Sequence, residues 1–149
     1  MSRIVVGVDG SVESQEALRW ALEEGELRAA EVVAVHSYGH GPSDVPKTYL
    51  AEAGKLDEAR QAERQEAQEL IAAALEHAGA DERKVTVTRE LAPGEPPTAA
   101  LLERSAEADL LVIGSRGLGG FTGALLGSVS QHCVQHAACP VVVVRDGGS

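Results

Sequence analysis

A glycine-rich segment from Gly114 to Ser128 is the part of the chain best suited to hold a ligand. It follows an apolar run and leads into a stretch with helical character. Glycines let backbone N–H groups approach phosphate oxygens, and the N-terminus of a following helix adds a partial charge of about +0.5. Ser128 and Ser130 offer hydroxyl donors, and Arg116 offers a cation. These residue types predict a phosphate-binding site.

Two other phosphate-binding loops fit this segment badly. A P-loop has a lysine after its last glycine, whereas every lysine of the chain lies outside the segment. A dinucleotide fingerprint needs a third glycine and follows the first strand, but here Gly117 and Gly119 are followed by Thr122, late in the chain. Walker-type and dehydrogenase chemistry are therefore disfavoured. On glycine content alone, a surface turn without a ligand is the alternative.

A second group of reactive residues is less convincing. His132, Cys133, His136 and Cys139 are close in sequence, and the two histidines lie four apart, a spacing that can chelate a transition metal. On a helix, however, Cys133 points about 100° away from His132. We predict no metal site here, and two exposed histidines with two small thiols are the simpler interpretation. Because the chain also has no nucleophile elbow, we predict no catalytic residue.

The elements that position these residues alternate between short apolar runs and longer helical patterns, which is typical of βαβ units around a parallel sheet. Five runs predict strands: Arg3–Val8, Glu31–Ser37, Lys84–Glu90, Asp109–Gly114 and Pro140–Arg145. The first, fourth and fifth are nearly continuous in Val, Ile and Leu, as expected for strands covered on both faces. The third alternates Val with Thr and predicts an edge strand.

Four helices are predicted between these strands. The first follows Ser11 as N-cap, the second and longest covers Lys55–Ala78, the third starts at Pro96 and Pro97 and runs to about Ala106, and the fourth runs from about Gly127 to the Cys139–Pro140 step. The stretch Tyr38–Gly54, rich in Gly and Pro, predicts a long mobile loop. It either covers a ligand or is a plain surface connection.

Composition limits the possible partners. The 149 residues predict a single domain spanning 1–149, and the formal net charge of −10 with 3% aromatic residues argues against nucleic acid as a partner. No apolar run is long enough to cross a membrane, which argues against a membrane protein. The start of the chain shows no leader pattern and the two cysteines form no disulfide framework, so we expect a cytoplasmic location.

The spacing of three glycines resembles a known family. Gly114, Gly117 after two residues, and Gly127-Ser128 after nine more match the Gly-2x-Gly-9x-Gly-(Ser/Thr) pattern of the ATP-binding branch of the universal stress proteins. The opening strand through Ser11 and the closing strand from Cys139 are similar to that family as well. The resemblance implies a flavodoxin-like, adenine-nucleotide alpha-hydrolase-like α/β domain. It implies a five-stranded parallel sheet in the order 3-2-1-4-5 with helices on both faces. A homodimer through the last strand, 140–145, is also implied, and an open apolar edge strand favours it.

The resemblance also implies a set of nucleotide-binding residues. Asp9 matches the acidic residue that contacts the nucleoside, Gly7 and Val8 would pass beneath the adenine, and the backbone of Ser37 would bond the base. The remaining residues belong to the ribose and phosphate region: Gly114, Ser115, Arg116, Gly117, Gly119, Gly127, Ser128, Val129 and Ser130. The alternative for Asp9 is a charge or cap at the start of the first helix.

The predicted ligand is ATP, with ADP and AMP as alternatives, together with Mg²⁺. The first functional hypothesis is a stress-response regulator or sensor whose state depends on nucleotide occupancy. The second is a slow ATPase, or an adenylyl or phosphoryl transferase, that uses the same site. The third is an interaction module that binds no nucleotide.

Overall fold

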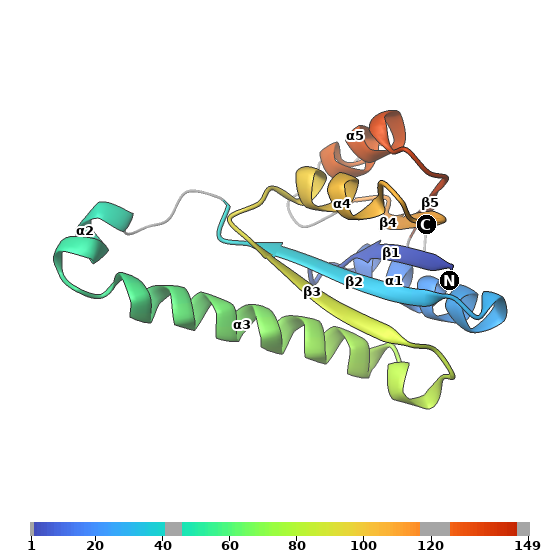
Figure 1. Ribbon diagram of the computed structural model, residues 1–149, viewed down its shortest axis with the longest axis horizontal. Helices are drawn as coiled ribbons and strands as arrows, with labels where there is room; N and C mark the ends of the chain where they lie inside the picture. Colours follow the sequence, from blue (N-terminus) through green and yellow to red (C-terminus); the bar gives the residue numbers. More distant parts are fainter. Residues whose placement is uncertain (1, 41–45, 117–125, 146–149) are drawn as a thin grey trace.

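The computed structural model describes residues 2–40, 46–116 and 126–145. Strands and helices alternate along most of this length (Figure 1). The strands are β1 Arg3–Gly7, β2 Glu31–Tyr38, β3 Val87–Pro93, β4 Leu110–Gly114 and β5 Val141–Val144. The helices are α1 Val12–Arg28, α2 Lys47–Glu52, α3 Leu56–His77, α4 Pro97–Ser105 and α5 Ser128–His136, with a short 3₁₀ turn at Ala80–Glu82.

All strand pairs in the sheet are parallel, and the strand order is β3-β2-β1-β4-β5, which confirms the predicted topology. The central strand is β1, where Val5 lies opposite Val33 of β2 and Leu111 of β4. From β1 the chain adds β2 and β3 on one side of the sheet and then β4 and β5 on the other. The carboxyl ends of β1 and β4 therefore form the switch point at which open α/β sheets bind ligands.

Helices cover both faces of the sheet. On one face, Leu18 and Leu22 of α1 and Ile71 of α3 join the buried side chains of the strands in one apolar core. On the other face, Leu101 of α4 and Cys133 of α5 belong to a second core. Fully burying an aliphatic side chain contributes about 1.5–3 kcal/mol, so these two cores hold the strand ends in fixed positions. Across the described ranges, no helix has the length and apolar character needed to span a membrane.

Three sequence-based expectations need correction. The third strand lies three residues later than predicted, because its pairing with β2 continues to Pro93 opposite Tyr38. The stretch Tyr38–Gly54 is not one long loop: Tyr38 closes β2, and the helix formers of Lys47–Glu52 form α2. Helix α5 ends at His136, short of the predicted Cys139–Pro140 step.

Candidate functional site

Side-chain hydrogen bonds stabilise the turn that joins β1 to α1. The Ser11 N–H donates to Asp9 Oδ1 at 2.8 Å, and the Ser14 N–H donates to Ser11 Oγ at 3.1 Å, so Ser11 is the N-cap of α1 as predicted. The Ser14 hydroxyl accepts from the Asp9 N–H at 3.2 Å and donates to the Ser11 carbonyl at 3.2 Å. These bonds fix the half-buried Asp9 carboxylate at the edge of the sheet.

The end of β4 lies directly against the first turn of α1. A Cβ atom on Gly114 would come within 2.7 Å of Glu13 Cβ and 2.8 Å of the Glu13 carbonyl carbon, so the strand and the helix can approach this closely only at a glycine. The turn is also tied to its neighbours: the Ser115 N–H donates to the Val144 carbonyl at 2.8 Å, and the Ser115 carbonyl accepts from the Gly127 N–H at 2.7 Å. Gly114 is therefore required by packing, whether or not a ligand lies beside it.

Helix α5 begins beside the same turn. Its N-cap, Gly127, has no side chain that could accept a hydrogen bond, and the first backbone bond of the helix runs from the Gln131 N–H to the Gly127 carbonyl at 2.9 Å. The N–H groups of the first turn come before that bond and have no intrahelical acceptor. They belong to Ser128, Val129 and Ser130. Together with the helix dipole, these donors form a site suited to an anion.

The two serines of α5 differ in what they can offer a phosphate. The Ser130 hydroxyl is buried and donates to the Gly114 carbonyl, which ties α5 to the end of β4. Ser128 is exposed at the first position of the helix. Of the two predicted hydroxyl donors, only Ser128 points to solvent, and Ser130 offers its backbone N–H.

The end of β2 contributes a residue that sequence reasoning passed over. His36 is 8% exposed, and its Nδ1 lies 2.8 Å from the Val8 carbonyl oxygen. Because a carbonyl only accepts, Nδ1 carries the hydrogen. The imidazole also stacks on Tyr38, with ring centroids 6.2 Å apart. A histidine directly after the apolar run 32–35 was the available sequence signal. Its bond to the Val8 carbonyl joins the end of β2 to the residue that follows β1.

Arg116 makes a contact that the sequence did not predict. Its guanidinium lies 3.8 Å from Glu13 Oε1, so the cation pairs with the first turn of α1. The side chains are 33% and 14% exposed, which makes this a modest interaction that solvent screens in part. A phosphate group nearby would compete with Glu13 for Arg116.

The structure brings three groups of predicted residues to one edge of the sheet. They are Gly7, Val8 and Asp9 at the end of β1, Gly114, Ser115 and Arg116 at the end of β4, and Gly127, Ser128, Val129 and Ser130 at the start of α5. Ser37 lies on the adjacent strand β2. The side chain of Val8 belongs to one core and that of Val129 packs against the other, so both face inward. Gly117 and Gly119 lie outside the described residues.

The histidine and cysteine residues of α5 point in different directions. The rings of His132 and His136 lie with centroids 4.4 Å apart on the exposed side, while Cys133 is fully buried in the core beneath α4. Burial raises the pKa of both the Cys133 and the Cys139 thiol, so each stays protonated at neutral pH. The two thiols are unpaired.

Comparison with known proteins identifies relatives over nearly the whole chain. A family model described as the universal stress protein family matches residues 1–145. Universal stress protein Rv2623 of Mycobacterium tuberculosis is 38% identical over 145 residues, which cover 96% of this chain and 45% of that relative. The chain thus spans less than half the length of the curated relative it matches.

Solved structures show the same similarity. Universal stress protein UspA from Lactobacillus plantarum superposes with a TM-score of 0.79 at 24% identity, covering 97% of each chain. A universal stress protein from Archaeoglobus fulgidus in complex with dAMP gives a TM-score of 0.64 at 25% identity, covering 97% of this chain and 98% of its own. A universal stress protein in complex with cAMP gives a TM-score of 0.64 at 26% identity, covering 97% and 96%.

Proposed function

The chain belongs to the universal stress protein family, and we propose from this premise that it binds an adenine nucleotide, ATP in the first place, with Mg²⁺. The observation that carries the proposal is the start of α5. Its first-turn N–H groups, beginning at Ser128, adjoin the turn after β4 at the switch point of the sheet. Two structural relatives were solved with adenine nucleotides, cAMP and dAMP.

The side chains around the switch point suggest how the nucleotide would lie. The phosphates would accept from the N–H groups at the start of α5 and from the Ser128 hydroxyl, with Arg116 exchanging its contact to Glu13 for a phosphate oxygen. The Asp9 carboxylate, held by the Ser11 N–H, would accept from the ribose hydroxyls or the adenine amino group. The backbone at Ser37 would bond the base.

The proposed role is that of a sensor in the stress response, and its support is the link between the binding turn and β5. The Ser115 N–H donates to the Val144 carbonyl, and Gly114 lies opposite Val144 in the ladder. Any shift that a nucleotide imposes on this turn therefore reaches the C-terminal strand directly. With two unpaired thiols, the chain also fits the reducing cytoplasm.

We propose that the same strand joins two copies of the chain in a homodimer. Strand β5 is at one end of the strand order, and its four valines are half-buried within one chain. An apolar edge strand of this kind is stabilised by pairing with a second copy. Light scattering on the purified protein should give twice the chain mass, and a monomer mass at micromolar concentration would contradict the dimer.

The test of nucleotide binding is calorimetry on the purified chain with ATP, ADP, AMP and cAMP, each with and without Mg²⁺, after removal and mass analysis of any bound ligand. We expect one adenine nucleotide per chain and weaker binding of GTP. Gly127→Val should abolish binding, because the branched apolar side chain would block the approach of phosphate to the first-turn N–H groups of α5. Circular dichroism should show an intact fold, because Gly127 has an extended backbone that any residue adopts (φ −74°, ψ 171°). The control is Ala138→Val, beyond the other end of α5. A folded protein that binds no adenine nucleotide contradicts the proposal.

A further inference from the structure

A pocket of about 420 Å³ lies away from the switch point, between the α2–α3 pair and the ends of β2 and β3. Helix α3 extends past the end of the sheet to α2, so no strand lies alongside the beginning of the helix (Figure 1). The volume falls in the range of small-molecule sites, about 300–1,000 Å³. The pocket is lined by Tyr38, Gly39, Lys47, Leu50, Leu56, Ala59, Arg60, Gln61, Glu63, Arg64, Pro93 and Gly94.

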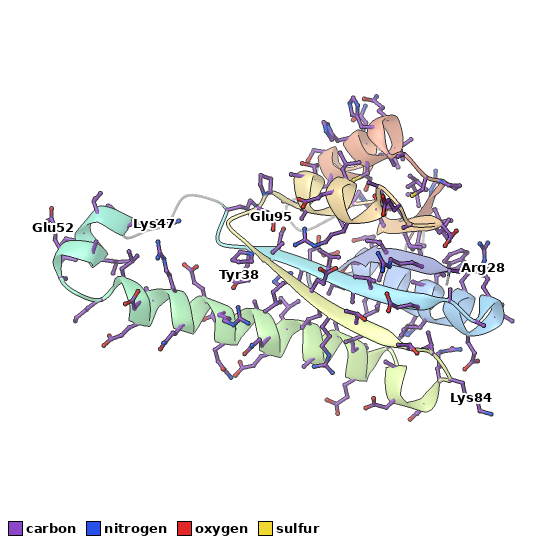
Figure 2. The ribbon with its side chains drawn as sticks, in the orientation of Figure 1. Arg28, Tyr38, Lys47, Glu52, Lys84 and Glu95 are labelled. Carbon is purple, nitrogen blue, oxygen red and sulfur yellow. The ribbon has the colours of Figure 1, made fainter. Side chains whose placement is uncertain are left out.

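Backbone hydrogen bonds hold the two sides of the pocket. On the strand side, the Gly94 N–H donates to the Tyr38 carbonyl at 2.8 Å, which joins the ends of β3 and β2. On the helix side, the Lys55 N–H donates to the Leu50 carbonyl at 2.8 Å, which folds α2 back toward the start of α3. Figure 2 shows Tyr38 and Lys47 on opposite sides of the space above the first half of α3.

One face of α3 serves two purposes. In the second half of the helix, residues at helical spacing from Ala67 to Leu75 are buried against the sheet. The same stripe continues into the first half with Leu56, Ala59, Arg60, Glu63 and Arg64, which line the pocket. The face thus changes from apolar to mixed apolar and cationic at the point where the sheet ends. Leu56 and Ala59 are half-buried in this first half of the helix, so apolar surface lies beside the cations.

The charge of the pocket is opposite to that of the protein. Its lining carries Lys47, Arg60 and Arg64 against the single carboxylate of Glu63, in a chain of formal net charge −10. Among the described residues, none of these three cations forms an ion pair, whereas other arginines, such as Arg28 and Arg104, do. The three cationic residues are exposed, so an anion with an apolar part could reach their charges while it contacts the apolar lining.

We propose that this pocket binds a small organic anion with an apolar body, such as an aryl carboxylate or an aryl phosphate. The apolar body would lie against Leu50, Leu56 and Ala59, and the head group would be bound by Lys47 and Arg60, with Arg64 at the rim. The proposal does not depend on nucleotide binding at the switch point, because it uses a different set of side chains.

The test uses two fluorescent probes that differ only in the charged sulfonate group, anilinonaphthalene sulfonate and the neutral phenylnaphthylamine. Each is titrated into nucleotide-free protein and, separately, in the presence of Mg²⁺-ATP, so that probe bound at the nucleotide site is identified by its displacement. The double variant K47Q/R60Q is compared with K84Q/R89Q, which removes one lysine and one arginine that are exposed outside the pocket. We expect one sulfonate probe per chain, bound about tenfold more weakly by K47Q/R60Q and unchanged by K84Q/R89Q. The neutral probe should bind weakly and equally to all three proteins.

Two further experiments test the location of the probe and the preferred head group. Ala59→Trp should fill the pocket and remove sulfonate binding, and its circular dichroism shows whether the fold is kept; if it unfolds, the charge variants still decide. Naphthoate and naphthyl phosphate should displace the probe, and the stronger competitor identifies the preferred head group. The proposal is overturned if wild type binds no probe, if both double variants bind it equally, or if neutral naphthol competes as well as the two anions.

Discussion

Helices α1 and α5 both begin at the carboxyl edge of the sheet, but their N-termini differ. At α1, the Ser11 side chain accepts from the Ser14 N–H, so the helix has a side-chain cap, and the Ser14 hydroxyl bonds the Asp9 N–H and the Ser11 carbonyl. At α5, Gly127 offers no capping side chain. Of the two helix termini, α1 is therefore a structural joint with a side-chain cap, and α5 is the candidate site for an anion.

The first prediction concerns a variant that caps the N-terminus of α5. Gly127→Asp supplies a capping carboxylate to α5 and places a negative charge where the phosphate is expected. Two unit charges about 4 Å apart at an effective dielectric of 20 repel by about 4 kcal/mol, so ATP affinity should fall about a thousandfold. Stability should stay level or rise by a few tenths of a kcal/mol, because Asp caps a helix slightly better than Gly. Calorimetry with Mg²⁺-ATP and urea unfolding measure the two effects.

The matched control is Gly127→Asn, which caps the helix without adding charge. It should weaken ATP binding by less than Gly127→Asp does, because it competes for the N–H groups but does not repel the phosphate. If Gly127→Asp binds ATP like the wild type, the phosphate does not lie at α5, and the difference between the two helix termini has no bearing on ligand binding.

The second prediction tests the rigidity of the joint at α1. Gly114→Ala would force a Cβ to within 2.8 Å of the Glu13 carbonyl carbon, and because that neighbour is backbone, the first turn of α1 must move. We expect a loss of about 3 kcal/mol in the free energy of unfolding, or about 6–12 °C in Tm. The control is Gly7→Ala at the end of β1, where the nearest atoms are the flexible methyl groups of Leu101 at 3.1 and 3.3 Å. Gly7→Ala should lower the free energy of unfolding by less than about 1 kcal/mol. Equal losses for the two variants would show that the first turn of α1 moves as readily as the Leu101 side chain.

The framework of the molecule could be predicted from sequence because its central strands are buried on both faces. Strands β1 and β4 are nearly continuous in Val, Ile and Leu, and β2 contains the apolar run 32–35. The bounds of all three differ from the prediction by one residue or less. The edge strand β3 lacks that signal, since its bounds depend on pairing with β2 through Pro93 opposite Tyr38. Helix α2 was missed because glycines and prolines around a six-residue helix dominate the local pattern.

Only those features of the site that depend on neighbouring residues in the sequence could be predicted. Ser11 as a cap and Ser128 at a helix start follow from short-range rules, and the structure confirms both placements. The crowding of Gly114 by Glu13, and the use of the Ser130 hydroxyl by the Gly114 carbonyl, join segments that are distant in sequence. A single sequence does not show such contacts. From sequence alone, a residue needed for packing, such as Gly114, therefore cannot be distinguished from one that binds a ligand.

The third prediction removes the hydroxyl that completes the α1 turn. Ser14→Ala removes the buried hydroxyl that accepts from the Asp9 N–H and donates to the Ser11 carbonyl, which keeps only its bond from the Gln15 N–H. The loss should cost about 1.5 kcal/mol in unfolding free energy. ATP affinity should fall only a few-fold, because Asp9 is still held by the Ser11 N–H. Urea unfolding and calorimetry measure these effects. A loss of stability below a few tenths of a kcal/mol would mean that water replaces the hydroxyl and that the α1 terminus is as open as that of α5.

The last and smallest expected effects come from the two serines of α5, which sequence alone treats as equivalent. Ser128→Ala removes an exposed hydroxyl and should weaken ATP binding about fivefold, close to 1 kcal/mol, with stability unchanged. Ser130→Ala removes the donor to the Gly114 carbonyl and should cost about 1 kcal/mol in stability, while ATP affinity stays within about twofold because the backbone N–H remains. The opposite pattern, with Ser130→Ala losing affinity and Ser128→Ala losing none, would place the phosphate deeper than the open end of α5, against β4.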